Sequence, residues 1–254
     1  MMAQLFGHER LVVYQKSMAF VKVQSELLEQ TSRRISASDH LARAAESILF
    51  NIAHASSSWT PKERLAYLGY ANGSALECAA CLDIFVAKAL LADEIIDPMK
   101  ASLSEIVSML IAMRKTAANR ICEEASEYRT AKGRRFSHED LEVYQTALRF
   151  TGWVESASKT FSCSEDLLFK LDSSSTTTVL NIAEGNGRFS GADRVKFLAI
   201  AYKATVQSAS LLDLAVIRSP SKPLVEDARN MLRSTAAMLK SLSAAIKQDS
   251  LSPT

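Results

Sequence analysis

Residues 6–15 read FGHERLVVYQ, and residues 136–145 read FSHEDLEVYQ. The correspondence continues without insertion or deletion, so that residues 6–83 reappear as residues 136–213 at a constant offset of 130. Internal self-similarity of this kind indicates a duplicated structural unit. We therefore predict two similar domains in this chain of 254 residues: copy one, residues 1–130, and copy two, residues 131–254.

Each copy has the apolar spacing of amphipathic helices. The first helix is expected from about Glu9 to Gln30 and from about Glu139 to Lys159, and the fourth helices are expected to begin at Pro98 and Pro223. The five prolines and eight glycines fall mainly between the helical stretches. Four helices joined by short loops favour an antiparallel bundle. The prediction is an all-α protein with two tandem antiparallel up-down-up-down four-helix bundles.

The third helix of each copy has a clear starting signal. Thr60 is a residue type preferred as a helix N-cap, and Glu63 is suited to the third helical position. Pro61, between them, suits the first helical position. Ser190 and Asp193 occupy the equivalent positions in copy two. Either cap is expected to stabilise its helix by ~1 kcal/mol.

The end of the second helix is the most informative polar stretch. Asn51 and Asn181 are both kept late in an apolar helix, which favours a buried side-chain hydrogen bond to a neighbouring helix or loop. In copy two, Gly185 is expected to be a left-handed C-cap, and Glu184 is expected to pair with Arg188 across the turn.

The start of copy two and the segment before it allow two further predictions. Ser137 and Asp140 have the spacing of a capping box for the first helix of copy two. Residues 121–137 are either a linker or an extension of the preceding helix that ends at Gly133, and the extension is favoured.

No set of residues suggests catalysis, a metal site or a bound cofactor. His8 and His138 are equivalent and lie beside helix starts, where capping or packing is the expected role. Cys78 and Cys81 lie in the middle of a helix and have no second cysteine pair to complete a zinc site, so they are expected to pack in the core. We expect a protein that is not an enzyme.

The composition predicts a cellular location but does not identify a binding partner. The chain has 30 Lys and Arg against 28 Asp and Glu, a formal net charge of +2, and copy two is the more basic half. There is no apolar run long enough to span a membrane and no signal-peptide pattern. Four cysteines do not make a disulfide scaffold in a chain of this length. The expected location is the cytoplasm.

Basic residues in copy two are the candidates for nucleic-acid contacts, because phosphate neutralisation supplies much of the affinity of such complexes. The candidates are Arg188, Arg194, Lys196, Lys203, Lys132, Arg134 and Arg135. The alternative is a solvated face with scattered cations and no binding role.

Residues 178–188, TVLNIAEGNGR, and residues 197–201, FLAIA, resemble the signature of a bacterial four-helix-bundle family. That family comprises proteins encoded in ribosomal RNA intervening sequences and the accessory variability determinant of diversity-generating retroelements. Residues 136–147 are similar to its first helix. The glycines Gly185 and Gly187 belong to this signature, whereas copy one reads HASSS at residues 54–58 in their place.

The resemblance implies a small non-enzymatic protein of a kind that assembles as rings, often fivefold. It also implies RNA or DNA, or a nucleoprotein such as a reverse transcriptase with its RNA, as partner. The other hypothesis is a protein–protein scaffold, a homo-oligomer or an intramolecular pairing of the two bundles through exposed apolar faces, without a nucleic-acid role.

Overall fold

A computed structural model describes residues 7–30, 35–58, 60–119, 136–157, 164–218 and 225–249. The α-helices of this part of the chain are α1 (Val12–Gln30), α2 (Ser36–Ser57), α3 (Pro61–Ala87), α4 (Asp93–Asn119), α5 (Glu142–Ala157), α6 (Glu165–Asn186), α7 (Gly191–Arg218) and α8 (Glu226–Asp249). Two short 3₁₀ helices, η1 (Gly7–Arg10) and η2 (Ser137–Asp140), precede α1 and α5.

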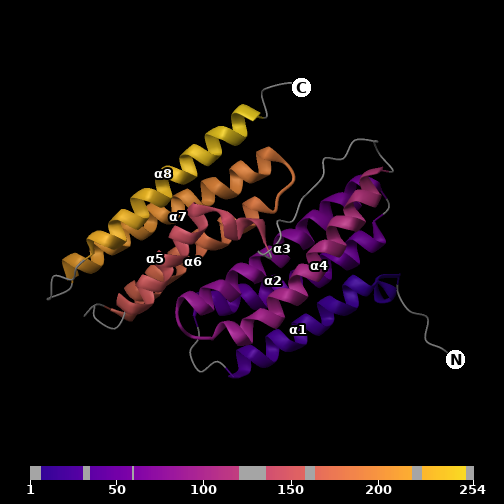
Figure 1. Cartoon of the computed structure of the whole chain (residues 1–254), viewed down its shortest axis with the longest axis horizontal. Helices are drawn as coiled ribbons and strands as arrows, with labels where there is room; N and C mark the ends of the chain where they lie inside the picture. The colour runs from indigo at the N-terminus through magenta and orange to yellow at the C-terminus, as the bar shows by residue number, and fades with distance from the viewer. Residues whose placement is uncertain are drawn as a thin grey trace.

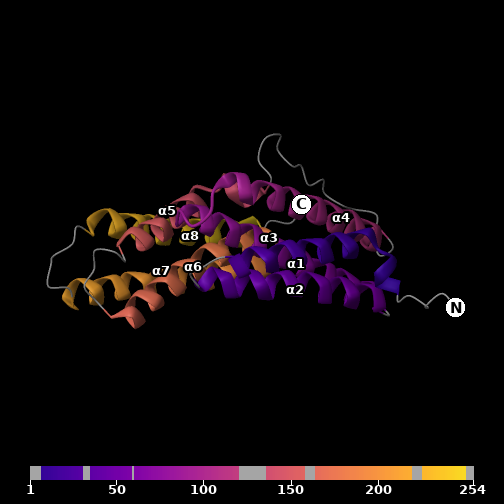
Figure 2. The same cartoon turned by 90° about the horizontal axis from the view of Figure 1, so that it is seen from below.

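The helices form two four-helix bundles, as predicted. In copy one each helix contacts the next, and α1 closes the bundle against α4; in copy two α5 closes against α8 in the same way. Figure 1 shows the two bundles side by side, with α3 in the middle of the molecule, and Figure 2 shows that they overlap along part of their length. The boundary predicted near residue 130 lies outside the described residues.

The two bundles share a hydrophobic core. The larger core contains α3 residues such as Leu82 together with Leu180 and Ile182 of α6 from copy two. A smaller core, around Phe150 and Leu212, lies within copy two alone. Since apolar burial is the main stabilising term in folding, the continuous core ties the two halves together.

The first helices begin later than predicted. Gly7–Arg10 and Ser137–Asp140 are separate 3₁₀ turns, and the α-helices start after Leu11 and Leu141. Ser137 is not the N-cap of the first helix of copy two, because Ser137 and Asp140 lie within η2 and α5 begins only at Glu142. The Ser137 hydroxyl accepts a hydrogen bond from Asn186 Nδ2 at 2.6 Å.

The fourth helix of copy one begins earlier than predicted. α4 starts at Asp93 and contains Pro98 in its interior, so a proline that suits a first turn does not mark the start. In copy two, α8 starts at Glu226, and Pro223 lies outside the described residues. The predicted extension of α4 to Gly133 also lies outside them, beyond Asn119.

The third helices start where their caps were placed. Thr60 accepts a hydrogen bond from the Glu63 amide at 3.2 Å, and Pro61 is the first helical residue. In copy two the Ser190 hydroxyl lies 3.5 Å from the Asp193 amide nitrogen. These caps fix where α3 and α7 emerge from the turns that precede them.

Candidate functional site

The contact between the two bundles, here called the joint, is built around residues 184–188, the signature turn. The Gly187 carbonyl accepts a hydrogen bond from Asn72 Nδ2 of α3 at 3.2 Å. A Cβ atom at Gly187 would lie 2.1 Å from Leu76 Cδ1, so the absent side chain is what lets the turn rest on α3. The signature turn of copy two is therefore an attachment point for copy one.

Gly185 is not the left-handed C-cap that was predicted. The helix continues to Asn186 because the Gly187 amide still donates to the Ala183 carbonyl at 3.1 Å, and Gly187 itself is right-handed, with φ −80°. A Cβ at Gly185 would lie 3.1 Å from Phe197 Cβ. Gly185 thus serves the close approach of α6 and α7.

Arg188 is buried in the joint rather than presented to solvent. Its side chain is 12% exposed and pairs with Glu184, as predicted, while its guanidinium carbon lies 4.5 Å from the Phe197 ring centre and 5.5 Å from that of Tyr70. Burial raises the pKa of Glu184, although Arg188 opposes this shift. The position of Arg188 does not suit a phosphate contact.

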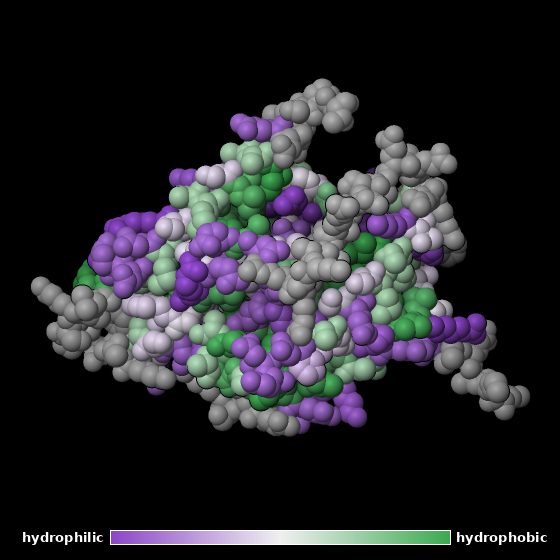
Figure 3. Space-filling view, in the orientation of Figure 1, coloured by the Kyte–Doolittle hydropathy of each residue, from purple (hydrophilic) through white to green (hydrophobic). Residues whose placement is uncertain are grey.

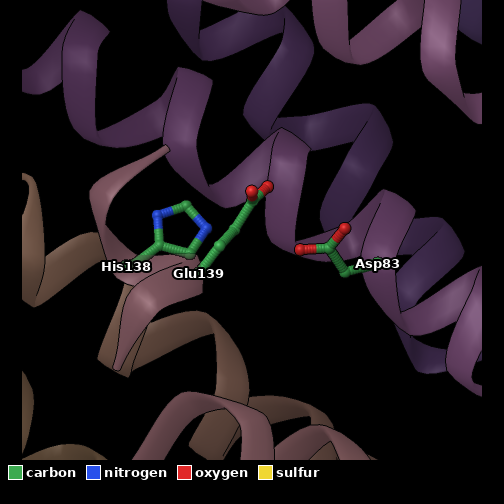
Figure 4. Close-up of side chains that lie close together, drawn as sticks. All are labelled: Asp83, His138 and Glu139. Atoms are coloured by element: carbon green, nitrogen blue, oxygen red, sulfur yellow. The ribbon is translucent and has the colours of Figure 1, made fainter. Parts of the chain in front are cut away.

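A second polar cluster joins the bundles at Asp83, where residues of α3, α4, η2 and α5 meet. Lys100 Nζ lies 2.6 Å from Asp83 Oδ1 and also pairs with Glu139, and the Tyr144 hydroxyl donates to Asp83 Oδ2 at 2.7 Å. Figure 4 shows Asp83, His138 and Glu139 lying close together across the joint. Burial raises the pKa of Tyr144, and the Asp83 charge adds to that shift.

His138 is fully buried in this cluster, stacked on Phe136 and in edge contact with Tyr144. Neither ring nitrogen has a hydrogen-bond partner. Burial, together with the nearby Lys100 ammonium, lowers the pKa of His138 to about 3. The histidine is therefore a neutral packing residue at neutral pH.

The same cluster has the donor types of a metal site, since ligand atoms of Asp83, His138 and Glu139 lie within 4.8 Å of one another. Lys100, however, already bridges both carboxylates. Burial works against its charge, but Asp83 and Glu139 outweigh that effect, and the pKa of Lys100 is raised. The lysine is the cation of this cluster, so the geometry favours an ionic lock between the bundles.

A third contact is fully interior. The Lys88 ammonium, whose side chain is 1% exposed, lies 2.5 Å from Asp172 Oδ1 and 3.8 Å from Glu155 Oε2. Lys88 follows α3 of copy one, and both acids belong to copy two. Buried charges are tolerated only when paired, so these residues also align the two bundles.

The other predicted basic residues fall into three groups. Lys196 and Lys203 are exposed on α7. Lys196 Nζ lies 3.1 Å from Asp193 Oδ1, and the two side chains are 73% and 49% exposed. Arg194 is half-buried, and its Nε atom is buried without a partner. Lys132, Arg134 and Arg135 lie outside the described residues.

Cations of α8 that were not predicted lie on the helix that packs against α7. Arg233, Lys240 and Lys247 are exposed and seven residues apart, and Lys240 Nζ lies 5.1 Å from the ring centre of Tyr202 on α7. Seven residues make nearly two helical turns, so the three cations share one side of α8. The spacing of these cations was visible in the sequence, but only the packing of α8 on α7 brings Lys240 to Tyr202.

Asn51 and Asn181, which are kept in both copies, do not make the hydrogen bond to a neighbouring helix or loop that was predicted for them. Asn51 Nδ2 donates to the Ser47 carbonyl at 2.8 Å and Asn181 Nδ2 to the Thr177 carbonyl at 2.8 Å, four residues earlier in their own helices. A short polar side chain can bond locally to its own helix as readily as to a neighbour.

The cysteines of α3 fit the expected packing role. Cys78 and Cys81 are fully buried, and burial raises the pKa of both thiols well above the usual value. A protonated, inaccessible thiol is a poor nucleophile and a poor metal ligand.

Among the described helices, none is both long and apolar enough to cross a membrane.

Fold and joint together define a tandem four-helix-bundle protein in which the signature turn of one bundle is anchored on the other. The family model for "23S rRNA-intervening sequence protein" matches residues 9–112 and again residues 139–241. The chain belongs to this family, as a duplication of its unit. Comparisons with curated proteins and with solved structures found no significant match.

Proposed function

We propose that the chain binds RNA electrostatically and without catalysis, through a basic surface on α7 and α8. This basic surface consists of Lys196, Lys203, Lys240 and Lys247, all of which are exposed. The observation that carries the proposal is charge segregation: residues 194–212 and residues 228–248 contain no Asp or Glu. A surface with several lysines and few acids attracts phosphates and releases counterions on binding. Lys196, at one end of this surface, also pairs with Asp193.

The geometry supports a contact with the phosphate backbone rather than with bases. Lys240 and Lys247 are about 10 Å apart along α8, and Lys203 lies on the neighbouring helix, so the cations form a broad surface and not a pocket. The family description supports an RNA ligand. A reverse transcriptase bound to its RNA is one nucleoprotein that would offer such phosphates.

The test is a salt titration of binding to a labelled single-stranded RNA, with duplex DNA measured in parallel. The variant carries Lys196→Glu, Lys240→Glu and Lys247→Glu, which leaves the buried Arg188 and half-buried Arg194 intact. If these lysines each neutralise one phosphate, the slope of log K against log salt becomes shallower by about 2, and affinity at low salt falls more than about tenfold.

The matched control changes three exposed lysines of copy one, Lys22, Lys62 and Lys115, to glutamate. Its net charge equals that of the test variant, so only a local effect separates the two. Equal losses in both variants, or no RNA binding by the unaltered chain at low salt, would overturn the proposal. Tighter binding to duplex DNA than to RNA would reject the RNA assignment.

The second candidate function is a protein–protein scaffold, and one observation favours it. Large apolar side chains reach the surface of both bundles, among them Phe50 at 60% exposure and Ile217 at 78%. Apolar patches also interrupt the polar surface in the face shown in Figure 3. Exposed apolar groups of this size are typical of interaction sites.

A further inference from the structure

His138 is a polar side chain of the joint whose donor atoms are unused. Its ring is fully buried, and neither Nδ1 nor Nε2 has a hydrogen-bond partner among the described residues. A neutral imidazole carries a lone pair on one ring nitrogen, and an unpaired polar atom in the interior is unfavourable. Phe136 stacks on the ring and Tyr144 contacts its edge, so the ring is held in one orientation. An ordered, unused lone pair of this kind is suited to a ligand.

The ring faces two carboxylates that come from both bundles. One ligand atom each of Asp83, His138 and Glu139 lies within 4.8 Å of the other two, and Figure 4 shows the three side chains converging. A nitrogen and two carboxylate oxygens match the donors of zinc sites that have three protein ligands. Donors bound tetrahedrally to zinc are about 3.3 Å apart, so these atoms need to close by at most about 1.5 Å.

The Asp83 carboxylate is oriented by a neighbouring residue. Its Oδ2 atom accepts a hydrogen bond from the Tyr144 hydroxyl at 2.7 Å, while Oδ1 is the atom that lies 2.6 Å from Lys100 Nζ. Hydrogen bonds from such outer residues commonly fix the direction of a metal-binding carboxylate. Asp83 Oδ1 is therefore directed at the position that a cation takes.

The Lys100 ammonium now stands at that position. It pairs with Asp83 and with Glu139, but it leaves both nitrogens of His138 unpaired. Lys100 supplies one positive charge between two carboxylates, whereas a divalent ion supplies two. A divalent ion would also bind the imidazole lone pair, so it would use all three donors.

A cavity beside the cluster gives Lys100 a place to move. The cavity has a volume of about 700 Å³, and Asp83, Lys100 and Glu139 line it together with Asp93, which is exposed in the first turn of α4. The same cavity gives an ion a path to the buried donors.

Asp93 lies seven residues before Lys100 on the same helix, nearly two turns away. Arg149 and Glu142 show that a cation and an acid at this spacing can pair in α5, because their side chains lie 3.0 Å apart. Lys100 can thus exchange its buried partners for Asp93.

We propose that the joint binds one divalent transition-metal ion of the zinc type through Asp83, His138 and Glu139, with Lys100 displaced into the cavity. The imidazole ligand favours zinc over Mg²⁺ and Ca²⁺, which prefer oxygen ligands. Asp83 belongs to α3 of copy one, whereas His138 and Glu139 belong to η2 of copy two. The bound ion therefore links the two bundles.

The repeat provides equivalents of all three ligands that do not form a second site. His8 and Glu9 lie in η1, and Asp213 lies on α7, which makes no contact with η1 among the described residues. The proposed site depends on the joint and not on residue type alone. These equivalents are matched positions for control variants.

The test is a titration of the full chain, without an affinity tag and stripped by a chelator, with Co²⁺ alone. Visible absorption of the bound Co²⁺ gives the affinity, and Zn²⁺ is then added as a competitor. The unaltered chain is expected to bind one ion that Zn²⁺ displaces. His138→Phe should weaken binding by at least about tenfold, because a ligand is lost. His8→Phe makes the same change at the equivalent position and should bind as the unaltered chain does.

Lys100→Met separates this site from adventitious binding at the surface. It removes the competing ammonium, so Co²⁺ affinity should rise by at least about tenfold, since one pair of charges no longer has to be exchanged. Glu139→Gln, with Glu9→Gln as its control, repeats the ligand test should circular dichroism show that His138→Phe has lost helix. No binding by the unaltered chain, equal affinities of a ligand variant and its control, or no gain in Lys100→Met would overturn the proposal.

Discussion

At the scale of single residues, the duplication places identical side chains in different surroundings. His138 is fully buried under α3, and its equivalent His8 is half-buried at the edge of the molecule, although both pack against a tyrosine in the same geometry. Burial and the nearby Lys100 ammonium lower the pKa of His138 to about 3. Position in the assembled molecule, and not residue type, sets the chemistry.

The lowered pKa of His138 predicts a pH dependence of stability. The unfolded chain takes up a proton near pH 6.5, but the folded chain does so only at about 3, so the free energy of unfolding should fall as the pH drops below 6.5. The loss approaches about 1.4 kcal/mol per pH unit. Urea unfolding between pH 7 and 5 measures it.

The comparison variant is His138→Phe, which removes the titrating group and should flatten this slope. His8→Phe is the matched control, because it makes the same substitution at the equivalent position of copy one, where the histidine is half-buried. Because slopes are compared, a uniform change in stability does not affect the result. Parallel slopes for the unaltered chain and His138→Phe would contradict a neutral buried histidine.

At the scale of structural elements, the signature turn of copy two is used to attach it to α3. Its glycines are needed for close packing: Gly185 against α7 and Gly187 against Leu76. In copy one the equivalent turn contains Ser57 and Ser58, whose hydroxyls donate to carbonyls of their own helix. The family signature is therefore kept where a neighbouring bundle covers the turn.

Gly187→Ala should destabilise the protein by about 1–3 kcal/mol. With φ −80° and ψ −5° the backbone at Gly187 suits any residue, so the cost comes from the collision with Leu76 and not from conformational strain. Denaturant unfolding of Gly187→Ala, Leu76→Ala and the double variant should give a coupling energy of about 1 kcal/mol or more. Additive effects of the two changes would show that the turn does not rest on Leu76.

At the scale of the whole molecule, the two bundles share a hydrophobic core and have polar contacts at the signature turn, at Asp83 and at Lys88, which favours their unfolding as one unit. Among the described residues, α2 and α3 of copy one both contact copy two, whereas α7 makes no contact with copy one.

Cooperative unfolding of both halves is the expected consequence of the shared core. Each copy contains one of the two tryptophans, Trp59 and Trp153. Trp59→Phe and Trp153→Phe leave one fluorescent reporter in copy two or in copy one. Both variants should show urea midpoints that coincide with each other and with circular dichroism. Two separated transitions would mean that the bundles fold independently.

The amino-acid sequence by itself determined the local and repeated features of this protein. Helical periodicity and the cap formed by Thr60 and Glu63 depend on neighbouring residues, and the offset between the copies follows from comparing the two halves of the sequence, so each was visible without a structure. The pairing of Glu184 with Arg188 is of the same kind, since four residues separate them along one turn. Such features follow from short-range geometry.

Only the tertiary structure decided what the residues of the joint contact. Arg188, Gly187 and Asp83 act across the joint, with partners more than 60 residues away along the chain or from the other copy. A side chain's burial and pKa depend on which helix covers it, and the repeat assigns the same residue type to covered and uncovered positions. The sequence therefore determines two bundles, and the packing of one bundle on the other determines that Arg188 is interior while Phe50 is exposed.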